Sequence, residues 1–117
     1  MPRTELQVIG EDAENRALAY LREQGLELVE RNFSCKVGEL DLVMRDRQHL
    51  VFVEVRERSS PHFGGAAASI TPAKQKRIVR AAKYYLLRYP TIPPCRIDVV
   101  AIDGHHLSWL RNAIVEM

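Results

Sequence analysis

The chain has 117 residues, a length typical of one domain, so we expect a single domain over residues 1–117. Hydrophobic residues are 46% and charged residues 27% of the sequence, which argues against an intrinsically disordered chain. The longest apolar run is shorter than a membrane span, and charged residues near the start leave no hydrophobic region for a secretory signal. We therefore expect a cytoplasmic protein without membrane contact.

The net charge of +2 conceals an uneven distribution along the chain. Residues 71–90 carry six cations and no acid, and +6 on this segment against +2 overall leaves −4 elsewhere. The six cations are Lys74, Lys76, Arg77, Arg80, Lys83 and Arg88. Such an asymmetry can indicate a polyanionic partner.

Periodicity predicts an α/β fold with the order helix, three strands, helix, strand and a short edge strand. Apolar residues recur at helical spacing over residues 12–24, and Gly25 ends that helix. Residues 26–33, 39–44 and 50–56 are expected to be strands, with turns at 35–38 and 46–49. A loop rich in Gly, Ser and Pro follows at 59–65.

The second helix is expected to begin at the Thr71–Pro72 pair, because threonine caps helices and proline favours their first position. It should run to about residue 89, before Pro90. Residues 97–102 then predict a fourth strand, and 107–110 an edge strand. The result is an αβββαβ core with a central mixed sheet and an added edge strand.

Three acids interrupt apolar faces of these elements. Glu14 shares the core-facing stripe of the first helix with Ala17 and Leu21. Asp41 lies on the strand at 39–44, opposite a face formed by Leu40, Leu42 and Met44, and Glu54 shares a face with Leu50 and Phe52. If the second and third strands form a hairpin, Asp41 and Glu54 lie near one another.

Two neighbouring carboxylates repel unless a cation lies between them, and Mg²⁺ is typically held by one or two carboxylates with waters and phosphate oxygens. Arg56, beside Glu54 on the same strand face, could stabilise a transferring phosphoryl group. This pattern favours metal-assisted phosphodiester hydrolysis, with Mg²⁺ or Mn²⁺ as cofactor. The alternative is a set of solvated or cross-strand ion pairs, in which Glu54 and Arg56 pair with Arg45 and Asp46.

The second helix is amphipathic with a cationic face, because Lys76, Arg80 and Lys83 follow helical spacing and Arg77 lies beside them. That face could bind DNA phosphates, which would make affinity strongly dependent on salt. Two alternatives remain: a solvated basic face, or packing against a second subunit in a homodimer.

Several stretches resemble the YraN-type family of the restriction endonuclease-like, or PD-(D/E)xK, superfamily, which also includes archaeal Holliday junction resolvases. The resemblance extends from Ile9 to about Ile102. The matching stretches are Gly10-Glu11-Asp12-Ala13-Glu14, Ala17, Tyr20-Leu21, Gly25, Asn32, Gly38-Glu39-Leu40-Asp41-Leu42-Val43, Val51-Phe52-Val53-Glu54-Val55-Arg56, Lys74-Gln75-Lys76-Arg77, Ala81-Ala82 and Arg96-Ile97-Asp98-Val99-Val100.

The resemblance implies a restriction endonuclease-like αβββαβ core and a nuclease motif. It places Asp41 and Glu54 on the metal ligands, with the backbone carbonyl of Val55 as a further ligand and Glu14 as the helix acid. Arg56 stands where the motif has lysine. Gln75 falls near a polar position of the superfamily's second helix. Together with the cationic face of that helix, this gives the expected DNA-binding residues Lys74, Gln75, Lys76, Arg77, Arg80 and Lys83.

Arg56 is the departure that matters, because a guanidinium stays charged and cannot act as a base, whereas a buried lysine can. Leu40 also replaces the proline that precedes the motif aspartate in some members. Three hypotheses follow: a metal-dependent endonuclease acting on branched or junction DNA, a nucleic-acid-binding module with weak or no catalysis, and an interaction subunit whose acidic cleft is a relic.

Overall fold

The computed structural model describes residues 5–58 and 65–116, with side chains from residue 11 onward in the first range. Its elements, in chain order, are α1 (Glu5–Glu23), β1 (Glu27–Cys35), β2 (Gly38–Asp46), β3 (His49–Arg58), η1 (Ala67–Ser69), α2 (Pro72–Leu86), β4 (Cys95–Asp103) and β5 (His106–Ile114). This order confirms the predicted α/β class, with β5 as the added edge strand.

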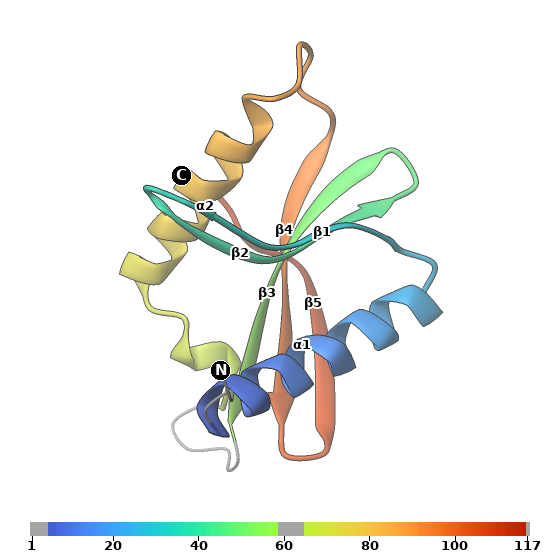
Figure 1. The fold of residues 1–117 in the computed structure, drawn as a ribbon, viewed down its shortest axis with the longest axis vertical. Coiled ribbons are helices and arrows are strands. Elements are labelled where there is room, and N and C mark those ends of the chain that lie inside the picture. The colour runs from blue at the N-terminus through green and yellow to red at the C-terminus, as the bar shows by residue number, and fades with distance from the viewer. Residues whose placement is uncertain (1–4, 59–64, 117) are drawn as a thin grey trace.

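The five strands form one mixed sheet in the order β1-β2-β3-β4-β5. Only β3 and β4 pair in parallel, and α2 makes the connection between them. The other neighbours are antiparallel. Figure 1 shows α1 and α2 on opposite sides of the sheet, so that β3 is covered on both faces.

Each helix buries its apolar side on one face of the sheet. On the α2 face, Phe52 and Tyr85 are almost fully buried and their rings meet edge to face, with centroids 5.7 Å apart. On the α1 face, Ala17 and Leu21 have no exposed surface and pack with Val51 of β3. Successive side chains of β3 point alternately into the core under α2 and the core under α1, because the strand is pleated.

Both helices differ in length from the prediction. α1 begins at Glu5 rather than at residue 12, because no proline interrupts that stretch and Gly10 weakens a helix without ending it. α2 ends at Leu86 rather than near residue 89. The next three backbone N–H groups bond to carbonyls three residues earlier, and Pro90 disfavours helical geometry in the residue before it.

The start of α2 agrees with the prediction. Thr71 is extended and its Oγ1 accepts a hydrogen bond from the backbone N–H of Lys74, at 3.3 Å, while Pro72 occupies the first turn. The predicted loop at 59–65 lies outside the described residues except for Gly65. The short helix η1, which follows it, was not predicted.

One face assignment in β2 was wrong. Leu40 packs in the α2-side core with Val43, and not with Leu42 and Met44 on the α1 side. The reason is that β2 pairs with β3 only from Leu42 to Asp46. Before that point the strand leaves β3, so strict alternation no longer predicts which face a side chain meets.

Gly38 allows the hairpin formed by β1 and β2 to touch α2. A Cβ at this position would lie 2.8 Å from the backbone oxygen of Arg77, which is part of a helix and cannot easily move. We expect Gly38→Ala to lower the free energy of unfolding by about 1–3 kcal/mol in urea denaturation. Gly104→Ala is the comparison: its Cβ meets nothing, so only the cost of its φ of +61°, about 1 kcal/mol, should appear. Equal losses would contradict the close-contact explanation.

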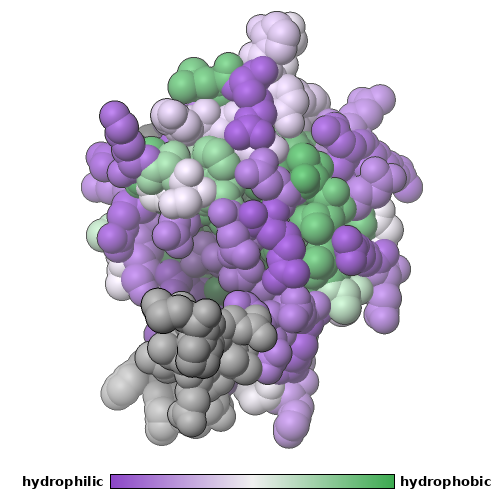
Figure 2. All heavy atoms as spheres, viewed as in Figure 1, coloured by the Kyte–Doolittle hydropathy of each residue, from purple (hydrophilic) through white to green (hydrophobic). Residues whose placement is uncertain are grey.

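Hydrophilic residues cover most of the face seen in Figure 2. Among the described residues, no helix is both long enough and apolar enough to cross a membrane.

Candidate functional site

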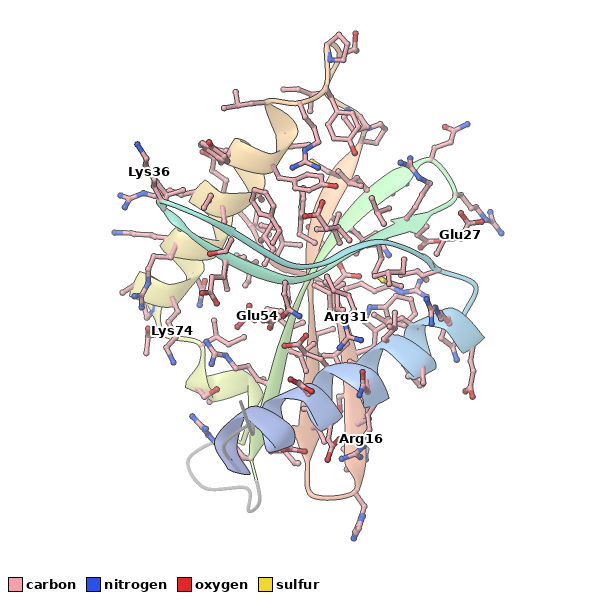
Figure 3. All side chains as sticks on the ribbon, in the orientation of Figure 1. Arg16, Glu27, Arg31, Lys36, Glu54 and Lys74 are labelled. Carbon is pink, nitrogen blue, oxygen red and sulfur yellow. The ribbon has the colours of Figure 1, made fainter. Side chains whose placement is uncertain are left out.

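A cavity of about 570 Å³ opens between the β1–β2 hairpin, β3 and the first half of α2. Figure 3 shows Lys36 at the hairpin tip and Lys74 on α2, with Glu54 on the sheet. The cavity is lined by Ser34, Cys35, Lys36, Val37, Gly38, Glu39, Asp41, Glu54, Val55, Arg56, Lys74, Arg77 and Ile78. Asp41, Glu54 and Arg56, which the sequence singled out, therefore share one cavity.

Asp41 lies where β2 separates from β3. Its Oδ2 accepts a 2.8 Å hydrogen bond from the backbone N–H of Val55, a donor of β3 beyond the last paired residue of β2. The Asp41 carboxylate thus accepts the hydrogen bond that a backbone carbonyl of the neighbouring strand would accept if the pairing continued. Burial raises the pKa of Asp41, although the N–H of Val55 and a hydrogen bond from Glu54 favour its charged form.

Glu54 is in contact with Asp41 and is only 9% exposed. Burial, and then the neighbouring Asp41 charge, raise the pKa of Glu54 from 4.5 to about 8. The hydrogen bond between the two carboxyls favours the protonated form of Glu54 and the charged form of Asp41, so the pair tends to share a proton.

Arg56 pairs with Glu54, with 3.2 Å between Nη2 and Oε1. Its Nε is buried without a hydrogen-bond partner among the described residues. The pairing of Arg56 with Asp46, considered above as part of the alternative, is contradicted, because Asp46 binds Arg96 at 3.0 Å and Arg56 pairs with Glu54. The guanidinium is thus held on the cavity wall beside the two carboxyls.

Glu14 approaches the same carboxyls from α1 but does not line the cavity. Its Oε1 lies 3.5 Å from Nη2 of Arg31, and the side-chain amide of Asn32 lies 3.0 Å from the same oxygen, to which its nitrogen donates once the amide is turned toward the carboxylate. Burial, followed by the charge of Asp41, raises the pKa of Glu14. The structure therefore brings Glu14 within electrostatic reach of Asp41, on the far side of the cavity floor.

The donor set at the cavity floor is small. Asp41 and Glu54 supply carboxylate oxygens, and Val55 lines the cavity beside them. In the described ranges, no group of three or more His, Cys, Asp or Glu side chains is arranged to hold a metal ion. A cation here would have two protein carboxylates and take its other ligands from water, backbone or substrate, as Mg²⁺ commonly does.

The cations of α2 divide between two surfaces. Lys74 and Arg77 line the cavity, one helical turn apart. The remaining predicted DNA-binding residues line a separate groove on the other side of the helix; these are Gln75, Lys76, Arg80 and Lys83. The Gln75 amide donates to the carbonyl of Ile70 at 3.2 Å. Only the first pair is next to the carboxyls.

Lys36 and Cys35 belong to the cavity wall and were not predicted as site residues. The sequence marked them only as part of a turn, and the turn signal gives no information on what the hairpin covers. Their place follows from the contact between Gly38 and α2, which depends on tertiary packing.

Comparison with known proteins identifies one family. The sequence model of the uncharacterised protein family UPF0102 matches residues 13–102. The UPF0102 protein of Janthinobacterium sp. (strain Marseille) is 59% identical over 113 residues, which are 97% of this chain and 92% of that protein. That of Cupriavidus metallidurans is 62% identical over 102 residues, 86% of this chain and 76% of that protein. The matched range includes Glu14 and the whole carboxylate site.

Proposed function

The chain belongs to the uncharacterised protein family UPF0102, and we propose that it is a metal-dependent endonuclease that hydrolyses phosphodiester bonds in DNA. One observation carries this proposal: the buried Glu54 and the half-buried Asp41, in contact with each other, line the floor of a cavity that Lys36, Lys74 and Arg77 also line. The αβββαβ order is also compatible with the restriction endonuclease-like fold. Branched or junction DNA is the substrate that the resemblance favours.

Asp41 and Glu54 fit a hard divalent cation. Each is pushed toward its protonated form by burial, so a positive charge between them would relieve both that cost and their mutual repulsion. When bound, Mg²⁺ or Mn²⁺ would polarise a phosphoryl oxygen and make water more acidic. The protein's part is to hold the two carboxylates together and to fix Asp41 through the N–H of Val55.

The three rim cations fit the phosphates on either side of the reacting one. Lys36 lies on the hairpin and Lys74 on α2 (Figure 3), and Arg77 of α2 lines the same cavity, so the cavity lining carries positive charge on two sides. Such a distribution attracts a polyanion and positions it over the acidic floor.

Arg56 can stabilise charge on a phosphoryl oxygen but cannot accept a proton. Its ion pair with Glu54 also supplies positive charge at the carboxyls without any metal ion. This contact favours a second candidate function, a DNA-binding module of the same fold with weak or no catalysis.

Cleavage and binding should be measured separately on junction, flap, single-stranded and duplex DNA, with Mg²⁺ or Mn²⁺. We expect metal-dependent cleavage that Asp41→Asn and Glu54→Gln each abolish while binding persists. Cleavage that survives both substitutions would rule out this site. Binding without cleavage in the parent protein would support the second candidate function, and no binding at low salt would contradict both.

Arg56→Lys tests the departure from the nuclease motif. Because lysine can lose its proton when buried, we expect a gain of about tenfold in the single-turnover cleavage rate, with an unchanged dissociation constant for DNA. Arg56→Gln is the matched control, since it removes the charge and adds no base. An equal gain in both variants would show that the ion pair with Glu54, and not proton transfer, limits the reaction.

Lys74→Gln combined with Arg77→Gln tests the rim. If both side chains contact phosphates, the slope of log affinity against log salt should become less steep by about 1.8, or about 0.9 for each contact on duplex DNA. The control is the same pair of changes at Lys76 and Arg80, which lie outside the cavity and should leave the slope unchanged. The reverse result would place DNA on the other side of α2.

A further inference from the structure

A groove runs along α2 on the side away from the carboxyl cavity. It consists of two adjoining hollows of about 340 and 270 Å³ between α2 and the end of β5. We call it the α2–β5 groove. Both hollows are lined by Val79, Lys83, Ile114, Val115 and Glu116, and these shared residues make them continuous.

The floor of the α2–β5 groove is apolar. Phe52, Ala82 and Ile97 lie beneath it and are already covered by the core, at 1%, 4% and 9% exposure. The accessible apolar surface of the floor comes from the half-buried Val79 and from Val115, which is 61% exposed, a high value for a large aliphatic side chain. Covering such surface with another apolar group is favourable because it removes the surface from water.

The rim of the groove is basic. Lys76 and Arg80 are exposed and, in the ranges that the structure describes, neither has an ion-pair partner. Lys83 differs from them because it pairs with Glu116. Two cations therefore remain available beside an apolar floor.

One part of the groove already pairs an acid with a cation beside apolar groups. Ile114 is 4% exposed and packs in the α2-side core, Val115 follows in the floor, and Glu116 pairs with Lys83 on the rim. An acidic side chain next to an apolar one thus neutralises one of the groove's cations. The free cations Lys76 and Arg80 extend the same arrangement toward the start of α2.

We infer that the α2–β5 groove binds an extended acidic peptide segment of a protein partner, with its apolar side chains on the floor and its carboxylates on Lys76 and Arg80. A peptide of this kind buries apolar area and neutralises charge together. A nucleic-acid backbone would use the cations but would leave the apolar floor uncovered. The inference does not rest on the proposed endonuclease function, because the two surfaces lie on different sides of α2.

The probe is a short synthetic peptide of alternating leucine and glutamate with a fluorescent label, whose binding is followed by fluorescence anisotropy. The matched peptide has serine in place of leucine and the same charge. We expect the leucine peptide to bind at least about tenfold more tightly, because only its side chains can cover the floor.

Three protein variants locate the binding. Lys76→Glu with Arg80→Glu should weaken the leucine peptide at least about tenfold, since like charges then face each other. Lys74→Glu with Arg77→Glu makes the same charge change on the same helix and should alter affinity by less than about twofold at 0.15 M salt. Glu116→Gln frees Lys83 and should tighten binding about two- to threefold. Circular dichroism verifies that each variant is folded.

The inference would be overturned if the two peptides bind equally or not at all, or if both double variants weaken the leucine peptide to the same extent. It would also fail if Lys76→Glu with Arg80→Glu abolishes binding of a duplex oligonucleotide while the leucine peptide does not bind. That outcome would make the groove rim a nucleic-acid surface.

Discussion

In metal-free buffer the protein is expected to lose about 2–4 kcal/mol of its free energy of unfolding as the pH rises from 5 to 8. The cause is Glu54, whose pKa is about 8 in the folded protein against an ordinary value of 4.5. A carboxyl with a raised folded pKa holds its proton more tightly in the folded state. The contribution of this proton to the free energy of unfolding is therefore fully present below the unfolded pKa and is lost as the pH rises through the folded pKa.

Glu54→Gln should remove most of this pH dependence, because glutamine keeps the shape and the hydrogen-bond donor but never ionises. The variant should be more stable than the parent at pH 8 and similar to it at pH 5. Urea denaturation at several pH values, followed by the fluorescence of Trp109, the single tryptophan, gives the comparison. A site that gains stability when its proposed metal ligand is removed would show the strain that catalytic sites often store.

The control for this series is Glu39→Gln, which removes an exposed carboxylate from the same cavity. It should change the pH profile far less than Glu54→Gln does, because the charge of Glu39 is the smallest of the influences on the pKa of Asp41. Adding Mg²⁺ at pH 8 should raise the stability of the parent and of Glu39→Gln but not that of Glu54→Gln. A parent profile that is flat between pH 5 and 8 would contradict the assignment of the shared proton.

Asp98→Ala is expected to cost about 3–5 kcal/mol of stability, the largest loss that we expect from one substitution. Asp98 has no exposed surface, and its carboxylate accepts hydrogen bonds from Arg96 Nε at 3.0 Å, Trp109 Nε1 at 2.9 Å and the N–H of Asn112 at 2.8 Å. Alanine leaves these donors without an acceptor inside the protein. The carboxylate also spans the irregular pairing of β4 with β5 near Ile97, so β5 should loosen first.

Urea denaturation measures the loss. The free energy of unfolding of Asp98→Asn should lie between those of Asp98→Ala and the parent, because asparagine keeps one acceptor oxygen. Glu116→Gln is the comparison because it removes an exposed ion pair, and it should lower the free energy of unfolding by less than about 1 kcal/mol. A loss below 1 kcal/mol for Asp98→Ala would show that the four-residue network does not hold β5 in place.

Much of the fold could be predicted because the local signals agree with the final structure. The Thr71–Pro72 cap, the run of β-branched and aromatic residues in β3, and the hairpin turn before it each specify an element without reference to the rest of the chain. The ends of α1 and α2 were less predictable. Helix ends depend on bonds that several neighbouring residues could make equally well.

The candidate site divides in the same way. The proximity of Asp41 and Glu54 could be predicted because each lies one residue beyond Leu42 and Val53, the last pair of the β2–β3 hairpin. Which surface each cation of α2 faces could not be predicted. The spacing shows that Lys74 and Lys76 lie on different sides of a helix, but it does not show which side meets the cavity. The wall formed by Lys36 was equally hidden, since it depends on how closely the hairpin approaches α2.

For the proposed DNA substrate, the close approach at Gly38 has a further consequence. Because Gly38 lies against the backbone oxygen of Arg77, the main-chain segments that carry the cations on either side are held at a fixed separation. A polyanion whose charges already have that spacing loses little conformational freedom on binding, whereas one that must bend pays the ordering cost itself. Selection would then act on the stiffness and curvature of the strand rather than on its base sequence.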